Sequence, residues 1–247
     1  MLRNVLVMAA SGIVLFSKEY ANAVAQPRLV GSLVTAMLEF SAKATGARVS
    51  FIQMSSVAVT VVTDDPQKVF IALFHDTTDA ADCMAFVARE ILTAFIAQHG
   101  AELGNVGHNL RDFQRFQSRI LTVLRDSVKP VLRKLQRQRG VMKTIFVADG
   151  TVTHATVDVD QIGVLANLEA LIETSNDMMS YSGSGVNSLT LQSSKTTCIQ
   201  VTAVEQSSGT LLIVMYKKGQ YAAKNLATIH ECVLMLRNVR NLQQSAR

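Results

Sequence analysis

The chain has 247 residues, 49% of them hydrophobic, and a formal net charge of +5 at pH 7. This length and apolar content fit one large domain or two of about 110 to 130 residues, and they exclude a largely disordered chain. The three cysteines, Cys83, Cys198 and Cys232, are far apart and form no CxxC pair, so neither a disulfide framework nor a thiolate zinc site is expected. A reducing, cytoplasmic compartment fits this cysteine usage best.

The chain begins with two apolar, β-branched segments, 4–10 and 13–20, joined by a Ser-Gly pair at 11–12. This pattern predicts a tight β-hairpin. The same apolar run, followed by small residues at 23–25, also mimics a secretory signal peptide. The Ser-Gly break and the charged pair at 18–19 favour the hairpin. No apolar run approaches the ~18 residues that a membrane-spanning helix needs.

Five further elements are expected before residue 100. They are a helix over 27–45, strands over 48–54, 57–63 and 68–74, and a helix over 79–98. Pro27 suits the first turn of the first helix and Gly46 its end, and Thr78 is a candidate N-cap for the second. The first half therefore has the order β-β-α-β-β-β-α. Residues 100–109 contain three glycines and no apolar period, which predicts a linker.

The positive charge is concentrated in Leu110–Arg139, which we call the basic segment. It has only two acidic residues against nine basic ones, Arg111, Arg115, Arg119, Arg125, Lys129, Arg133, Lys134, Arg137 and Arg139. Its apolar residues recur in steps of three or four, which places them on one helical face; they are Phe113, Phe116, Ile120, Leu124, Val128, Val131 and Leu135. A basic amphipathic helix is expected, with its apolar face buried, and Pro130 predicts a kink or break near Lys129.

Three interpretations of this segment remain open. Its arginines are merely solvated, or they form a docking surface for acidic membrane lipids or an acidic protein partner, or they bind nucleic acid. The chain has no tryptophan and few aromatic residues near the arginines, and it has no known nucleic-acid motif. Stacking and base readout therefore have no evident source, and nucleic acid is the least favoured partner.

The second half repeats the order of the first. A hairpin is expected around Asp149-Gly150, then a helix over 160–178 capped by Asp160, strands over 188–192, 196–204 and 210–216, and a helix over 221–243. The glycines of the loop 180–187 suggest a phosphate-binding loop, but no lysine follows at the required spacing. The predicted fold is α/β (α+β), with two similar domains, 1–108 and 109–247, the second opened by the basic helix. Each has a five-stranded, mostly antiparallel sheet with helices packed on it.

The first half, with the opening LRNVLVMAASGIVLFSKEY and the helix entry QPRLVGSLVTAMLEFSA, resembles a longin (SNARE-like) domain. The second half, led by the basic helix, has the order α-β-β-α-β-β-β-α and is similar to the roadblock family. This resemblance implies a protein-binding scaffold in vesicle trafficking or small-GTPase regulation, cytoplasmic and in peripheral contact with endomembranes. Its implied partners are other longin or roadblock subunits and a small GTPase. Unlike SNAREs, the chain shows no heptad-repeat helix followed by a membrane anchor.

No catalytic pattern emerges from the residues. The histidines form no HxxxH or HExxH pair, and GxSxG, P-loop and dinucleotide fingerprints are missing. His75-Asp76 and Cys83 could in principle do acid/base or nucleophilic chemistry, but a strand-end turn and an inert core thiol are the favoured interpretations. We therefore expect no enzyme activity, cofactor or metal. The alternatives are a nucleic-acid or anionic-membrane binder acting through the basic segment, and, less favoured, a hydrolase or transferase with a deep polar pocket.

Overall fold

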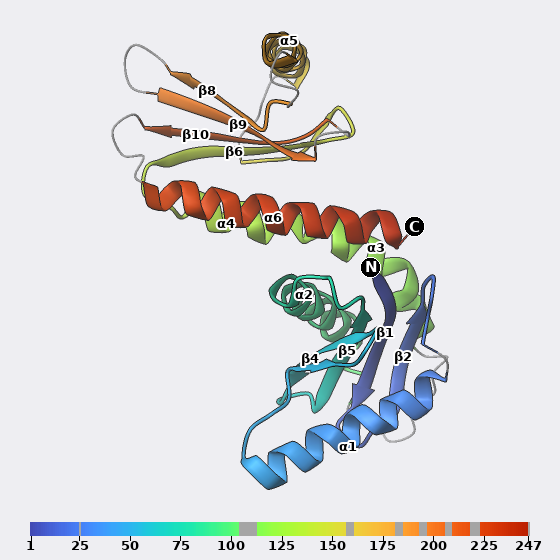
Figure 1. Ribbon diagram of the computed structural model, residues 1–247. Helices are drawn as coiled ribbons and strands as arrows, with labels where there is room; N and C mark the ends of the chain where they lie inside the picture. The colour runs from blue at the N-terminus through green and yellow to red at the C-terminus, as the bar shows by residue number, and fades with distance from the viewer. Residues whose placement is uncertain are drawn as a thin grey trace. The chain divides into compact units, whose positions relative to one another are not determined.

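A computed structural model of the protein is shown in Figure 1. It describes residues 1–24, 26–103, 113–156, 161–180, 185–192, 197–205, 209–217 and 223–246, without the side chains at 27, 28, 161–166, 169 and 223–225. The chain divides into two compact units. Unit 1 comprises Met1–Ser127 and Asn238–Arg247, and unit 2 comprises Val128–Arg237.

Unit 1 is built on a five-stranded antiparallel sheet with the order β2-β1-β5-β4-β3. Its elements are β1 (Leu2–Ala9), β2 (Val14–Glu19), α1 (Pro27–Thr45), β3 (Phe51–Gln53), β4 (Ala58–Asp64), β5 (Val69–His75), α2 (Ala81–His99), the 3-10 helix η1 (Gln114–Phe116), α3 (Gln117–Asp126) and the end of α6 (Ala223–Ser245). The hairpin between β1 and β2 turns at Gly12, whose φ of +87° is accessible to glycine at no steric cost. α1 begins at Pro27 and ends at Gly46, which has a φ of +70°.

The sheet of unit 1 is covered on both faces (Figure 1). Val34 of α1 lies in one apolar core with Leu6, Val59 and Phe74 of the strands. Because Gly31 has no side chain, α1 can approach the sheet there: a Cβ on Gly31 would lie 2.7 Å from the Cε of Met8. α2 covers the opposite face, against β4 and β5.

A cluster of aromatic rings joins η1 to the α2 side of unit 1. The ring of Phe95 lies 5.1 Å from that of Phe116 and 5.5 Å from that of Phe113, and Phe16 of β2 lies 5.4 Å from Phe116. His99 completes the cluster, 5.1 Å from Phe113. Since all four phenylalanines are at most 2% exposed, the start of the basic segment is part of the core of unit 1.

Unit 2 has the same strand permutation, β7-β6-β10-β9-β8, again fully antiparallel. Its elements are α4 (Val128–Gln136), β6 (Val141–Ala148), β7 (Thr151–Ala155), α5 (Gln161–Met179), β8 (Ser188–Gln192), β9 (Thr197–Glu205), β10 (Thr210–Lys217) and the first part of α6. Figure 1 shows α5 on one face of this sheet and α4 with α6 on the other. The hairpin before β7 turns at Asp149 and Gly150, whose φ values are +52° and +68°, as a type I′ turn requires.

The predicted fold class of two similar five-stranded antiparallel units is confirmed. The predicted domain boundary at 108/109 and the Asp160 cap lie outside the described residues, and the compact units divide the basic segment between Ser127 and Val128. The predicted helix break occurs at Ser127, two residues before Lys129, because Pro130 has no N–H to donate to the carbonyl of Asp126. Within the described residues, none of the helices is long and apolar enough to cross a membrane.

Candidate interaction surfaces

α1 carries a row of large apolar side chains on the face turned away from the sheet. We call this row the outer stripe; it consists of Leu29, Leu33, Met37 and Phe40, which are 65%, 53%, 38% and 73% exposed. Their spacing of four, four and three residues keeps them on one side of the helix. The outer stripe is therefore a continuous apolar ridge facing solvent.

The opposite side of α1 is also apolar, since Val30, Val34 and Leu38 pack toward the core of unit 1. Glu39 and Lys43 are the only charged side chains described on this helix, and they lie 3.5 Å apart. A helix that is apolar all round is normally buried all round. In the described part of the chain the outer stripe is exposed, and a contiguous exposed apolar surface of this kind is typical of interaction sites.

The edge of the unit 1 sheet next to β4 is formed by β3. This strand has three residues and pairs only with β4 in the described part of the chain. Phe51 and the adjacent Met54 are 39% and 42% exposed. An open edge with apolar side chains is a second surface that can receive a partner, although its short length limits how many backbone hydrogen bonds it offers.

The basic segment is amphipathic, as expected. All seven of its predicted apolar positions are buried, at 5% exposure or less. Arg111 lies outside the described residues, while the other eight predicted residues are at least partly exposed: Arg115, Arg119 and Arg125 in unit 1, and Lys129, Arg133, Lys134, Arg137 and Arg139 in unit 2. The segment therefore does not present its charges from one compact unit, and its role as a binding surface stays a prediction.

One of these charges has a partner on α6. The Nζ of Lys134 donates to Glu231 at 3.0 Å, and this hydrogen bond raises the pKa of Lys134. Both side chains are about 60% exposed, so the pair adds little to stability. Cys232, the next residue on α6, is buried, and burial raises the pKa of its thiol to about 11; a thiol in such a site is unreactive.

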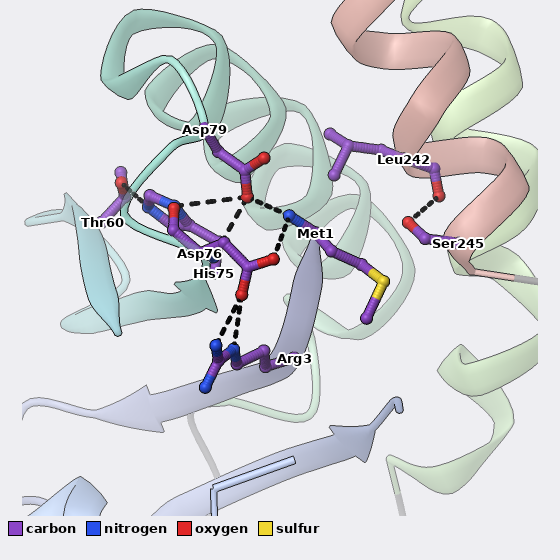
Figure 2. Close-up of polar contacts among 8 residues, drawn as sticks. All are labelled: Met1, Arg3, Thr60, His75, Asp76, Asp79, Leu242 and Ser245. Carbon is purple, nitrogen blue, oxygen red and sulfur yellow. Dashed lines mark hydrogen bonds and ion pairs between the residues drawn. The ribbon is translucent and has the colours of Figure 1, made fainter. Parts of the chain in front are cut away.

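A cluster of polar side chains lies where the start of β1 pairs with the end of β5 (Figure 2). Both the Nε and an Nη of Arg3 lie 2.7 Å from one carboxylate oxygen of Asp76. The Met1 amino group lies 3.1 Å from the other oxygen and also bonds to Asp79. Burial alone raises the pKa of Asp76, but its bonds to Arg3 and to the amino group hold that pKa below the usual value.

His75 is fully buried beside this cluster. Its Nε2 lies 2.9 Å from the hydroxyl of Thr60, and its Nδ1 lies 2.9 Å from the backbone carbonyl of Asp76. Burial lowers the pKa of the imidazole, so the neutral ring is favoured. Both ring nitrogens therefore have protein partners, and the Nδ1 also lies 3.7 Å from a carboxylate oxygen of Asp79. The interpretation of His75 as a strand-end residue without a chemical role stays a prediction.

Cys83 is the other residue considered for chemistry. Cys83 is 1% exposed, and burial raises the pKa of its thiol to about 12, which opposes formation of a nucleophilic thiolate. A cavity of about 390 Å³ in unit 1 is lined by Met1 and Asp79 but not by His75. No group of three or more metal-ligating side chains occurs among the residues that the structure covers.

Unit 2 contains a cavity of about 370 Å³ between α5 and the sheet. Its wall is mostly apolar, with Leu168 and Ile172 from α5 and Val147 and Leu211 from the strands. The polar side chains of its described lining are Glu173, Asn176 and Glu205, with no histidine, cysteine or hydroxyl group among them. The titratable side chains of this described lining are the two carboxylates, Glu173 and Glu205.

The architecture is thus a pair of α+β units with one shared strand permutation. No protein-family profile matches the sequence, and no curated protein matches it either. Similar solved structures include "MglB with tetrameric arrangement" (10% identity, 49% of this chain and 92% of that one, TM-score 0.44) and the gliding protein MglB from Thermus thermophilus (10%, 48% and 92%, 0.43). A Roadblock/LC7 domain from Streptomyces avermitilis is also similar (19%, 46% and 95%, 0.40). Each similarity extends over about half of this chain.

The outer stripe is the feature that sequence reasoning missed. In the sequence, Leu29, Leu33, Met37 and Phe40 belong to the same apolar period as Val30 and Leu38, and these six residues within twelve positions exceed one helical face. The signal was available in the sequence: between Pro27 and Lys43 only Arg28 and Glu39 are charged. A helix with so few charges predicts two covered faces.

Proposed function

We propose that the chain is a non-catalytic protein-interaction scaffold and that unit 1 binds its partner through the outer stripe of α1. The observation that supports this proposal most strongly is the ridge formed by Leu29, Leu33, Met37 and Phe40. All four of these side chains are exposed. Burying a side chain of this size contributes about 1.5 to 3 kcal/mol, less when it is already partly covered. Four such side chains in one row are enough to anchor an interface, because a few central residues supply most binding energy.

The proposed partner is a longin or roadblock-type subunit or a small GTPase, within a complex that acts in vesicle trafficking or small-GTPase regulation. This finer assignment is supported by the order of elements in each unit, which resembles the longin and roadblock families. The non-catalytic role is supported by His75, whose ring nitrogens are both engaged, and by the raised pKa of Cys83.

Affinity capture with matched variants tests the proposal. The stripe variant Leu33→Gln/Phe40→Gln places two polar amides on the ridge and is expected to reduce recovery of the partner at least tenfold. The control is Leu226→Gln/Leu234→Gln on α6, which changes two leucines that are also exposed, at 47% and 42%. This control should recover the partner as the unaltered chain does.

Two results would contradict the proposal. In the first, the unaltered chain recovers no longin or roadblock subunit, no GTPase and no trafficking factor. In the second, the stripe variant recovers such a partner as well as the control does, while circular dichroism shows that both variants are folded.

A further inference from the structure

The exposed side of α4 in unit 2 carries basic residues at a regular spacing. Lys129, Arg133 and Arg137 follow one another at intervals of four residues and are all exposed, so their side chains project from one side of the helix. Arg137 follows the last residue of α4, but its N–H donates to the carbonyl of Arg133 at 3.1 Å, which continues the helical turn. The opposite side of α4 is at most 5% exposed and packs inward.

Arg133 and Arg137 differ from Lys129 in this row, since Lys129 has an interaction within the protein. The sequence contains no acidic residue between Asp126 and Asp149, and Glu231 is paired with Lys134. Within the described residues, the side chains of Arg133 and Arg137 have no hydrogen-bond or ion-pair partner. Their positive charge lies near the C-terminus of α4, where it complements the helix dipole.

Further positive charge gathers at the turn after α4. Arg139 lies in this turn and is exposed. The N–H of Lys217, the last residue of β10, donates to the carbonyl of Gly140 at 2.9 Å, which brings an exposed lysine to the same place. The basic surface thus extends from α4 onto the end of the sheet, all within unit 2.

Two observations separate the possible partners of this surface. The described aromatic residues of unit 2, Phe146 and Tyr216, are only 3% and 4% exposed, so no ring among them is available to stack on a nucleic-acid base. Met142, two residues after Gly140, is instead 41% exposed. An exposed apolar side chain that closely follows a basic turn in the sequence suits the interface of a lipid bilayer, where headgroup charge and acyl chains meet.

We propose that α4 and the following turn form a docking surface for the anionic headgroups of a membrane, with Arg133 and Arg137 as its central contacts. The lipid class is an anionic phospholipid attracted by charge. This site lies in unit 2, whereas the outer stripe of α1 lies in unit 1.

The test measures binding of the full chain to vesicles of phosphatidylcholine with about 30 mol% phosphatidylserine at low salt. The variant Arg133→Gln/Arg137→Gln is expected to bind about 30-fold more weakly, since each basic residue near an anionic leaflet contributes ~1 kcal/mol, or about fivefold. The control Lys43→Gln/Arg89→Gln removes the same charge from exposed sites of unit 1 and should bind like the unaltered chain.

Two further arms identify the partner. The variant Arg133→Lys/Arg137→Lys keeps the charge and should retain binding, because headgroup attraction does not need the planar guanidinium fork. Polyuridylate should bind more weakly than the vesicles. The proposal is overturned if the unaltered chain does not bind vesicles, if the control weakens binding as much as the glutamine substitutions in α4, if the lysine variant loses binding, or if polyuridylate binds more tightly.

Discussion

Replacing Phe40 by alanine should leave the free energy of unfolding almost unchanged, whereas the same substitution at Phe95 should be severely destabilising. Phe40 is 73% exposed, so only about a quarter of its side chain loses contacts, and the expected cost is below about 1 kcal/mol. Phe95 is fully buried and lies 5.1 Å from the ring of Phe116 and 5.2 Å from that of His99. Its truncation should cost about 3 to 5 kcal/mol.

Urea unfolding followed by far-ultraviolet circular dichroism gives the overall ranking of the two variants. Because the chain has two compact units, one transition need not describe both, and hydrogen exchange at β1, β5 and α2 reports on unit 1 alone. Equal destabilisation by the Phe40 and Phe95 substitutions would show that Phe40 is packed within the protein. The outer stripe would then not be a free surface, and the reasoning would be refuted.

Three other predictions concern the core and the turns. Burial lowers the pKa of His75, so the unfolded state binds more protons as the pH falls below about 6.5, and the unfolding free energy should decrease there; a His75→Gln variant that keeps the same pH dependence would contradict this. Cys83 and Cys232, whose thiol pKa values burial raises to about 12 and about 11, should react with a disulfide reagent only after denaturation, and rapid labelling of the native protein would be inconsistent with their burial. Gly150→Ala should cost about 1 kcal/mol of stability although no atom lies within 4 Å of the added Cβ, because its φ is +68°; an unchanged melting temperature would argue against the strain.

The hydrophobic period correctly predicted which face of the basic segment is buried. Its apolar residues recur every three or four positions, and the charged residues occupy the positions between them. The same period could not separate the two faces of α1, where both are apolar. Their assignment depends on the close approach of Gly31 to Met8 on β1, which is a tertiary contact. Sequence spacing likewise could not place Arg3 beside Asp76, since the antiparallel register of β1 and β5 brings them together.

The position of the helix break illustrates a different limit. Pro130 correctly predicted an interruption, but the missing hydrogen bond affects the carbonyl four residues earlier, so the helices separate at Ser127. Ser127 is fully buried, and its hydroxyl donates to the carbonyl of Val123 at 2.8 Å. Such a bond from a serine to the carbonyl four residues earlier often bends a helix, and it ties Ser127 to the end of α3.

Site-specific photocrosslinking from position 40 tests the central claim most directly. A photoreactive phenylalanine analogue in place of Phe40 should crosslink to a longin or roadblock-type subunit or to a small GTPase, because the ring lies on the ridge that the partner covers. The same analogue at Met178 of α5, which is 74% exposed, provides a control of equal accessibility in unit 2. Crosslinking of that partner from position 178 but not from position 40 would contradict the proposed role of the outer stripe.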